Sequence, residues 1–276
     1  MDIGGRVVVV TGGGSGIGRA LCRAFAANGA ALVVVADIDE AAAHATTADI
    51  VASGGNAREQ HTDVAVEADV VRLVREVEHD APIDLFCANA GIMVQGGLES
   101  TDEQWRRMLD VNVMSHVYAA RAVVPSMLAR GDGYLLHTAS AAGLLSHLGS
   151  VSYAVTKHSV VAFAEWLAIT YGDAGIKVSC LCPQGVQTNM LTVKPGQATS
   201  SSPVSRDGIL SPETVADAVI AGLAAEDFLI LPHPEVARYE RRRAEDRDQW
   251  LQGMRRARAV AVEHGTLPDH RTGTTP

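Results

Sequence analysis

Aromatic residues are scarce in this sequence and make up 4% of its 276 residues. Small and β-branched side chains must therefore do most of the packing, as they do in buried parallel strands. Hydrophobic residues make up 47% of the chain and charged residues 20%. These proportions are typical of a globular protein and exclude a chain that is disordered throughout.

Cysteine is also rare. The four residues Cys22, Cys87, Cys180 and Cys182 each fall in a stretch that we expect to be a core strand or helix. Cys180 and Cys182 are two positions apart on one strand, so they share a face but are poorly placed to bond to each other. No pair has the C-x-x-C spacing of a zinc site, and no histidine pattern indicates a metal. We expect reduced thiols in a cytoplasmic protein that binds no metal.

Long apolar runs and basic charge are lacking too. No uninterrupted apolar run reaches the length that spans a membrane, and the first residues lack the apolar segment of a secretory signal. The formal net charge is −9. A protein that binds the phosphate backbone usually has a basic surface, so we expect neither a membrane nor a nucleic acid as a partner.

The chain does contain a regular alternation of apolar runs with helical patterns. This alternation predicts βαβ units and a parallel sheet with helices on both faces. We expect strands at Val7–Val10, Leu32–Ala36, Asn56–His61, Ile83–Ala88, Tyr134–Thr138, Lys177–Leu181 and Phe228–Leu231, and helices at Gly16–Asn28, Asp39–Ser53, Ala65–His79, Thr101–Arg130, Ser152–Tyr171 and Ser211–Ala225. The predicted fold class is α/β, a Rossmann-type doubly wound parallel sheet in a single domain over residues 1–276.

Two segments interrupt the alternation. Residues 188–210 include a stretch rich in Ser, Thr, Pro and Gly that has no clear period. A stretch of this kind inside a compact domain is often a lid over the substrate. Residues 233–276 look like a charged surface helix followed by a tail.

A glycine cluster joins the first strand to the first helix, where the sequence from Thr11 to Gly18 reads TGGGSGIG. Glycines here allow a tight turn and let the backbone approach a pyrophosphate at the helix N-terminus. Asp37 ends the second strand, where a carboxylate can bind the ribose hydroxyls and repel a 2′-phosphate. The only nearby cation is Arg19, which we expect to face solvent. NAD is therefore favoured over NADP.

Tyr153 and Lys157 are four residues apart in a predicted helix, so they share a face. A free phenol has a pKa of about 10, and a nearby ammonium lowers it toward the range useful for a base. Ser140 follows the strand Tyr134–Thr138, at a carboxyl end where ligands of open parallel sheets bind. Its hydroxyl could hold a substrate oxygen in line with Tyr153, although Ser140 alone would suggest a turn or cap.

Together these features resemble the single-domain branch of the short-chain dehydrogenase/reductase family, which carries TGxxxGxG and YxxxK motifs. The resemblance covers roughly Gly5 to Leu231 and includes Asn89-Ala90-Gly91 after the fourth strand. It implies that Lys157 also holds the nicotinamide ribose and that Asn112 holds a water linking Lys157 to solvent. The alternative for Asn112 is an ordinary solvent-facing side chain.

The resemblance also implies a set of residues around the cofactor. Asp63 would contact the adenine amine, assisted by the backbone of Val64. The alternative is that Asp63 caps the helix that begins near Ala65, and both roles could hold together. Val186 and Thr188 match the segment that holds the nicotinamide carboxamide. The full set is Gly12, Ser15, Gly16, Ile17, Gly18, Asp37, Asp63, Val64, Asn89, Ala90, Gly91, Tyr153, Lys157, Pro183, Val186 and Thr188.

One departure lies near the expected substrate pocket. The family usually has Pro-Gly after the sixth strand, whereas this chain has Pro183-Gln184-Gly185, so family-typical substrates are in doubt. His147 could reach a substrate, but we expect a surface-loop histidine. An apolar lining could come from Leu144, Leu145, Leu148, Met190 and Leu191, although core packing explains the first three as well.

We expect an NAD-dependent oxidoreductase that interconverts an apolar secondary alcohol and a ketone. Its catalytic residues would be Asn112, Ser140, Tyr153 and Lys157, with Tyr153 as the acid/base. An NADP-linked carbonyl reductase and a non-catalytic dinucleotide sensor remain as alternatives. The helices Thr101–Arg130 and Ser152–Tyr171 carry apolar or small residues on more than one face, so we expect a homodimer or homotetramer unless the tail folds back over them.

Overall fold

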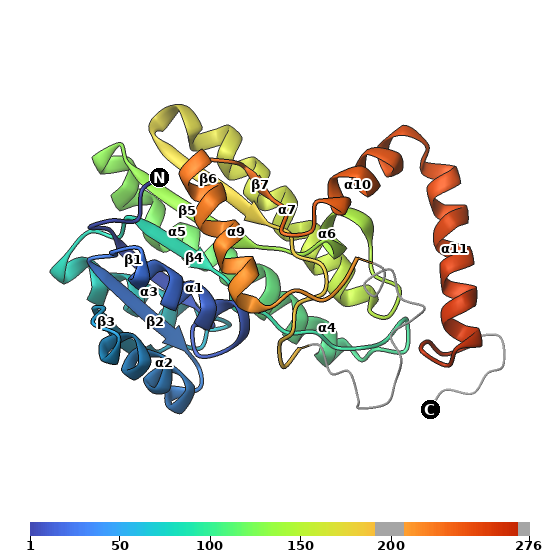
Figure 1. The fold of residues 1–276 in the computed structure, drawn as a ribbon, viewed down its shortest axis with the longest axis horizontal. Coiled ribbons are helices and arrows are strands. Elements are labelled where there is room, and N and C mark those ends of the chain that lie inside the picture. Colours follow the sequence, from blue (N-terminus) through green and yellow to red (C-terminus); the bar gives the residue numbers. More distant parts are fainter. Residues whose placement is uncertain (191–206, 270–276) are drawn as a thin grey trace.

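The computed structural model describes residues 1–190 and 207–269. Its centre is a seven-stranded sheet in the order β3-β2-β1-β4-β5-β6-β7, in which each neighbouring pair is parallel (Figure 1). The strands are β1 (Val7–Thr11), β2 (Leu32–Asp37), β3 (Ala57–His61), β4 (Leu85–Ala88), β5 (Gly133–Thr138), β6 (Ile176–Leu181) and β7 (Leu229–Ile230). The predicted fold class is confirmed.

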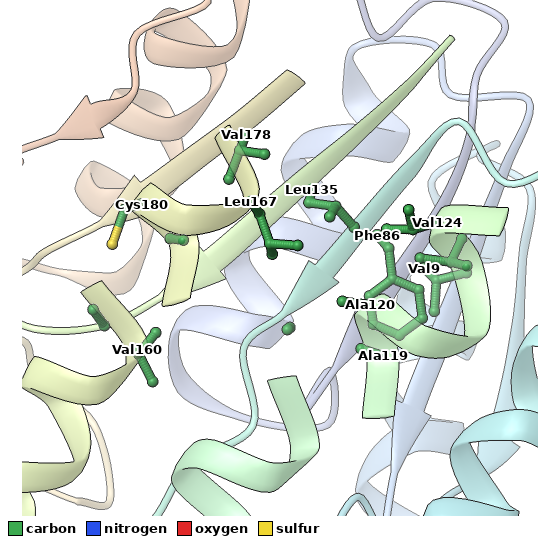
Figure 2. Packing of buried hydrophobic residues seen from close by; sticks show 14 of the residues in the cluster. Val9, Phe86, Ala119, Ala120, Val124, Leu135, Val160, Leu167, Val178 and Cys180 are labelled. Carbon is green, nitrogen blue, oxygen red and sulfur yellow. The ribbon is translucent and has the colours of Figure 1, made fainter. Parts of the chain in front are cut away.

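Helices cover both faces of the sheet, and each face has its own core cluster. One face carries α1 (Gly16–Ala27), α2 (Glu40–Ala52) and α9 (Pro212–Ala225), and the other carries α3 (Glu67–Asp80), α5 (Ser115–Arg130) and α7 (Val151–Tyr171). Figure 2 shows the second cluster, in which Val9, Phe86 and Leu135 of the strands meet side chains of α5 and α7. Valine runs suit this position because both faces of the strand are buried.

The helix predicted over Thr101–Arg130 consists of three segments. Thr101 and Gln104 form the expected capping box at the start of α4 (Asp102–Leu109). A π-helical turn, Asp110–Met114, then leads into α5. Such turns widen a helix locally and are frequent at functional sites. Ser211 and Pro212 begin α9 as expected, because the Ser211 hydroxyl accepts the Thr214 N–H.

Asp63 does not cap α3. That helix begins at Glu67 with Val66 at the cap position. Asp63 instead accepts the Ala65 N–H at 3.0 Å, so it closes a local turn before the helix. The capping alternative for Asp63 is wrong because the chain makes this extra turn first.

Beyond β7 the chain forms two helices, α10 (Glu235–Glu245) and α11 (Arg247–Glu263), where one was expected. Asp246 caps α11 by accepting the Gln249 N–H, which restarts the helix after a break. α11 lies at the right edge of Figure 1, away from the sheet. Residues 191–206 of the predicted lid and 270–276 of the predicted tail lie outside the described residues. Within the described ranges no helix has both the length and the apolar character needed to cross a membrane.

The remaining short elements are α6 (Ala142–Leu145) after β5 and a 3₁₀ turn, Gly172–Ala174, after α7. The parallel sheet places the carboxyl ends of β1, β4, β5 and β6 along one edge. Strand order reverses between β1 and β4, and ligands of doubly wound sheets bind at such a switch point.

Candidate active site

Thr11 ties the glycine turn to the segment after β4. Its hydroxyl accepts the N–H groups of Asn89 at 3.0 Å and Ala90 at 3.2 Å. The Asn89 side chain donates to the Thr11 carbonyl at 3.0 Å and accepts the Thr138 hydroxyl at 3.1 Å. The ends of β1, β4 and β5 are therefore joined by hydrogen bonds at the edge where the predicted site residues lie.

The glycine turn is packed so tightly that side chains are excluded. A Cβ on Gly18 would lie 2.0 Å from the Gly12 carbonyl oxygen, and Gly12 itself has a φ of +66°. Ser15 occupies the N-cap position of α1 but makes no side-chain cap hydrogen bond. The amides that begin α1 thus have no side-chain cap from Ser15, which suits an anion at this N-terminus.

Asp37 lies beside the turn, as predicted. Its carboxylate accepts the Gly14 N–H at 2.8 Å and the Asp39 N–H at 3.0 Å. Arg19 is half-buried rather than fully solvated, and its guanidinium donates to the Gly14 carbonyl through Nε at 3.0 Å and Nη2 at 2.6 Å. Gly14 therefore contacts one anion and one cation: its N–H donates to the Asp37 carboxylate, and its carbonyl accepts from the Arg19 guanidinium.

Lys157 is fixed between α7 and β5. Its ammonium donates to the Thr138 carbonyl at 2.8 Å and lies 5.7 Å from the centre of the Tyr153 ring. Only 2% of Lys157 is exposed, and burial lowers its pKa to about 8. The predicted pair on one helical face is therefore present, next to the carboxyl end of β5.

Ser140 completes the cluster from the loop after β5. Its hydroxyl donates to the Pro183 carbonyl at 3.3 Å and accepts the Ala142 N–H at 3.1 Å. Burial raises the pKa of the Tyr153 phenol, and its hydrogen bond with Ser140 lowers that pKa in part. The expected lowering of the Tyr153 pKa by Lys157 is not found in this arrangement, where burial has the larger effect.

Asn112 lies in the π-helical turn and is fully buried, so the solvent-facing alternative is wrong. Its amide accepts the Ile92 N–H at 2.8 Å and donates to the Ile92 carbonyl at 2.9 Å and to the Thr156 hydroxyl at 3.2 Å. A Cβ on Gly91 would lie 3.3 Å from Asn112 and 3.5 Å from the Lys157 ammonium. Gly91 thus marks the place where Asn112 and Lys157 approach the same stretch of backbone.

The other predicted cofactor residues lie around the same edge. Val64 is buried just after β3. The Thr62 N–H donates to the backbone carbonyl of Asp37 at 2.9 Å, which joins the end of β3 to the end of β2. Ile17 packs into the core cluster of the α1 face. Val186 pairs with Leu210 in an isolated bridge, and the side chain of Thr188 would lie 3.0 Å from a Cβ on Gly16.

A small apolar cluster surrounds Tyr153, and most of its residues were not predicted from the sequence. Met108, Ala142 and Tyr153 form it, and Ile92, Met93, Val94 and Met190 pack against it. Of the predicted lining residues Met190 belongs here, whereas Leu144 and Leu145 pack into the main core. Leu191 lies outside the described residues. Sequence reasoning missed the residues at 92–94 because the loop after Gly91 has no periodic pattern.

His147 is not a simple surface residue. Its ring packs edge-on against the Tyr153 ring with centroids 5.7 Å apart, and its Nδ1 accepts the Gly149 N–H at 3.1 Å. Burial lowers the pKa of His147, so its neutral form is favoured. His147 lies in a loop as expected, but it is half-buried because its ring packs against Tyr153.

Comparison with known proteins agrees with this geometry. The profile described as short chain dehydrogenase matches residues 6–198. The chain belongs to the short-chain dehydrogenase family. A relative named 1-deoxy-11-beta-hydroxypentalenate dehydrogenase, from Streptomyces exfoliatus, is 35% identical over 241 residues, which cover 85% of this chain and 86% of that protein.

Two solved structures that resemble this chain were determined with a bound dinucleotide. A short-chain dehydrogenase/reductase from Burkholderia phymatum in complex with NAD has a TM-score of 0.80 and 31% identity, and the match covers 90% of this chain and 96% of that one. A short-chain dehydrogenase from Sphingobium yanoikuyae in complex with NADPH has a TM-score of 0.76 and 25% identity, covering 90% and 94%. The family thus includes proteins bound to either nicotinamide dinucleotide.

Proposed function

We propose that this short-chain dehydrogenase is an NAD-dependent oxidoreductase that interconverts a secondary alcohol and a ketone. The observation that carries the proposal is the convergence of Ser140, Tyr153 and Lys157 beside the glycine turn. A hydroxyl, a phenol and an ammonium in this arrangement suit proton transfer at a substrate oxygen. A non-catalytic sensor would not need this set.

In the proposed reaction, Tyr153, Ser140, Lys157 and Asn112 each have a separate role. In oxidation the Tyr153 phenolate takes the hydroxyl proton of the alcohol, and the Ser140 hydroxyl holds the same oxygen. Lys157 joins α7 to the end of β5 beside the phenol, where any stabilisation of the phenolate by its ammonium must overcome the larger effect of burial. Asn112 keeps the Ile92 backbone in place near Lys157. A bound nicotinamide dinucleotide supplies the hydride acceptor in oxidation and the hydride donor in reduction.

NAD is the proposed cofactor because Asp37 is the acid at the end of β2, beside Gly14. A 2′-phosphate placed there would face its carboxylate. The runner-up is NADP, which Arg19 and the NADPH complex of the Sphingobium yanoikuyae protein favour. The Arg19 guanidinium already donates to the Gly14 carbonyl, so binding a 2′-phosphate would require Arg19 to give up those hydrogen bonds.

The proposed substrate is apolar apart from the reacting oxygen. Methionine and aliphatic side chains surround Tyr153, including Met108 and Met190. The relative from Streptomyces exfoliatus, named for dehydrogenation of a hydroxypentalenate, supports a bulky alcohol.

We further propose a homodimer or homotetramer of one-domain subunits in the cytoplasm. On α7 the exposed fraction of Ile169 is 83%, that of Trp166 is 53% and that of Val155 is 44%. Apolar side chains gathered on one helix favour burial against a second copy. The four cysteines are buried and unpaired, which supports a reducing compartment.

The decisive experiment is a screen of secondary alcohols and the matching ketones with NAD, NADP and their reduced forms. Cyclohexanol and larger cyclic alcohols should be oxidised with NAD, and short polar alcohols should react more slowly. Dinucleotide binding without turnover of any alcohol or ketone would support a sensor instead. Faster turnover with NADP would replace the proposed cofactor.

A further inference from the structure

His233 lies at the start of the C-terminal part of the chain, which the family profile over residues 6–198 does not reach. It follows β7 and precedes α10, and only 2% of it is exposed. Its Nδ1 accepts the backbone N–H of Gln184 at 3.2 Å. A buried imidazole therefore joins α10 to the segment after β6.

The segment that His233 holds lies between the catalytic residues and the glycine turn. On one side the Pro183 carbonyl accepts the Ser140 hydroxyl at 3.3 Å and the Ala141 N–H at 2.8 Å. On the other side Thr188 lies against Gly16. Residues 183–188, here called the carboxamide segment, thus contact both the proposed substrate site and the proposed pyrophosphate site.

Gln184 is the residue at which this chain departs from the Pro-Gly of the family. Its N–H donates to His233, while its side-chain Oε1 is buried and makes no hydrogen bond in the described part of the chain. The His233 Nε2 is buried without a partner there as well. With Nδ1 accepting, a neutral ring carries its proton on Nε2. The backbone of Gly208 and of Gly185 also interacts with the ring and raises its pKa.

We propose that His233 is a positioning residue for the nicotinamide end of the dinucleotide, acting through the Gln184 N–H to set the place of the carboxamide segment. The inference rests on the proposed function and on the role that the family resemblance implies for Val186 and Thr188, which is to hold the nicotinamide carboxamide. The adenosine end is held elsewhere, near Asp37. His233 should therefore affect one end of the cofactor and leave the other unchanged.

Protonation of His233 would break this tie, because a charged imidazole has two donors and no acceptor. Burial is the largest influence on the pKa of His233 and lowers it, while hydrogen bonds with the backbone of Gly208 and Gly185 and the carboxylates of Glu235 and Asp207 oppose that effect. Asp207 precedes α9 and accepts the Tyr239 hydroxyl at 3.0 Å, and Glu235 is the first residue of α10. The tie is thus intact at neutral pH and is lost in acid.

The test compares two ligands that differ only at the nicotinamide end. Dissociation constants of NAD and of ADP-ribose are measured at pH 7.5 and 5.5 for the full-length wild type, His233→Phe, His233→Gln and a control, His158→Phe. His158 contacts Arg243 of α10 at 3.3 Å but does not touch the carboxamide segment. Losing one buried hydrogen bond should weaken NAD binding by His233→Phe about tenfold and leave ADP-ribose binding unchanged.

The glutamine variant separates positioning from folding, because its amide oxygen can accept the Gln184 N–H but does not titrate. His233→Gln should restore NAD binding at pH 7.5 and should lack any weakening that protonation of His233 causes in the wild type as the pH falls. Equal loss of both ligands in His233→Phe, or no loss of either, would overturn the inference. A wild type that binds neither ligand would overturn the proposed function, and this inference with it.

Discussion

The Lys157 ammonium donates a hydrogen bond to the Thr138 carbonyl at 2.8 Å, which joins the middle of α7 to the last residue of β5. Ser140 follows Thr138 by two residues, and Tyr153 precedes Lys157 by one helical turn. One bond therefore sets the distance between the two elements that carry the proposed acid/base and the residue that holds the substrate oxygen. Because Lys157 is buried, no solvent competes for this bond.

The first prediction concerns Tyr153. Replacing it with Phe removes the hydroxyl and keeps the ring that packs against His147. Turnover should fall about 10²-fold or more, while NAD binding and melting temperature stay near the wild type. Tyr171→Phe on the same helix is the matched control and should retain activity. Normal turnover by the Tyr153 variant on an identified substrate would remove Tyr153 from the mechanism.

The second prediction concerns cofactor choice. Asp37→Ser should weaken NAD binding and strengthen NADP binding, because the carboxylate that faces the ribose hydroxyls is gone. Fluorescence titration with both dinucleotides measures the ratio of the two dissociation constants. Glu40→Gln, a nearby acid at the start of α2, is the control and should leave the ratio unchanged. A ratio unaltered in the Asp37 variant would show that this residue does not select NAD.

The third prediction compares two glycines. Gly18→Ala would place a Cβ 2.0 Å from the Gly12 carbonyl and should cost roughly 3 kcal/mol of stability or more, together with loss of dinucleotide binding. Gly172→Ala meets no atom within 4 Å, and Gly172 has a helical φ of −58°. That change should stabilise the fold by about 0.5 kcal/mol. Urea unfolding of both variants, followed by circular dichroism, decides this; equal stabilities would contradict the turn geometry.

The fourth prediction concerns a buried histidine pair. Nδ1 of His116 and Nδ1 of His137 lie 2.9 Å apart, and burial lowers both pKa values, that of His137 to about 4. An unfolded histidine titrates near 6.5, so below that pH the unfolded chain binds protons that the folded chain does not. Stability from this pair is complete above pH 6.5 and is lost as the pH falls toward 4. For His137 alone the loss is about 3 kcal/mol at most.

A double variant tests the pair, because replacing both partners leaves no unpaired nitrogen. His116→Leu/His137→Leu should lose less unfolding free energy between pH 7.5 and pH 5 than the wild type does. His79→Leu is the control, since the His79 side chain is 86% exposed. If the double variant kept the full pH dependence, other groups would be responsible for the acid sensitivity.

The fifth prediction concerns assembly. Ile169→Glu combined with Trp166→Glu should convert the proposed oligomer into a monomer, because charge on an apolar contact face must be desolvated. Leu98→Glu is the control: Leu98 is 96% exposed and lies outside α7. Light scattering coupled to size exclusion gives the mass of each. A wild type that is monomeric at micromolar concentration would defeat the oligomer proposal.

Much of the fold could be predicted because its signals are local. The valine run predicts the buried strand β1 without help from distant residues. Likewise, Thr101 and Gln104 predict the start of α4 through their capping box. Strand ends moved by one or two residues because pairing with neighbours decides them. The break between α10 and α11 was missed, since both flanking segments are charged and helical in composition.

The site was predictable as a list of residues but not as a set of contacts. The sequence placed Asn112 in the site only through the family resemblance and left a solvent-facing side chain as the alternative, because the π-helical turn in which it is buried was not predicted. Arg19 and His147 were expected to face solvent, yet each folds back onto a backbone group. Such contacts depend on tertiary distances, and single-sequence patterns carry only the spacing along the chain.

The order of the strands also bears on how the protein folds. β1 pairs with β2 on one side, but its other neighbour is β4, where Val9 lies opposite Phe86. Long-range parallel pairings of this kind form slowly, because a large loop must close before any contact is gained. The switch point at the carboxyl ends of β1 and β4 therefore exists only after both halves of the sheet have formed and joined. A dinucleotide that binds there would bind the native state and not partly folded states. It would therefore stabilise the native state relative to all of them.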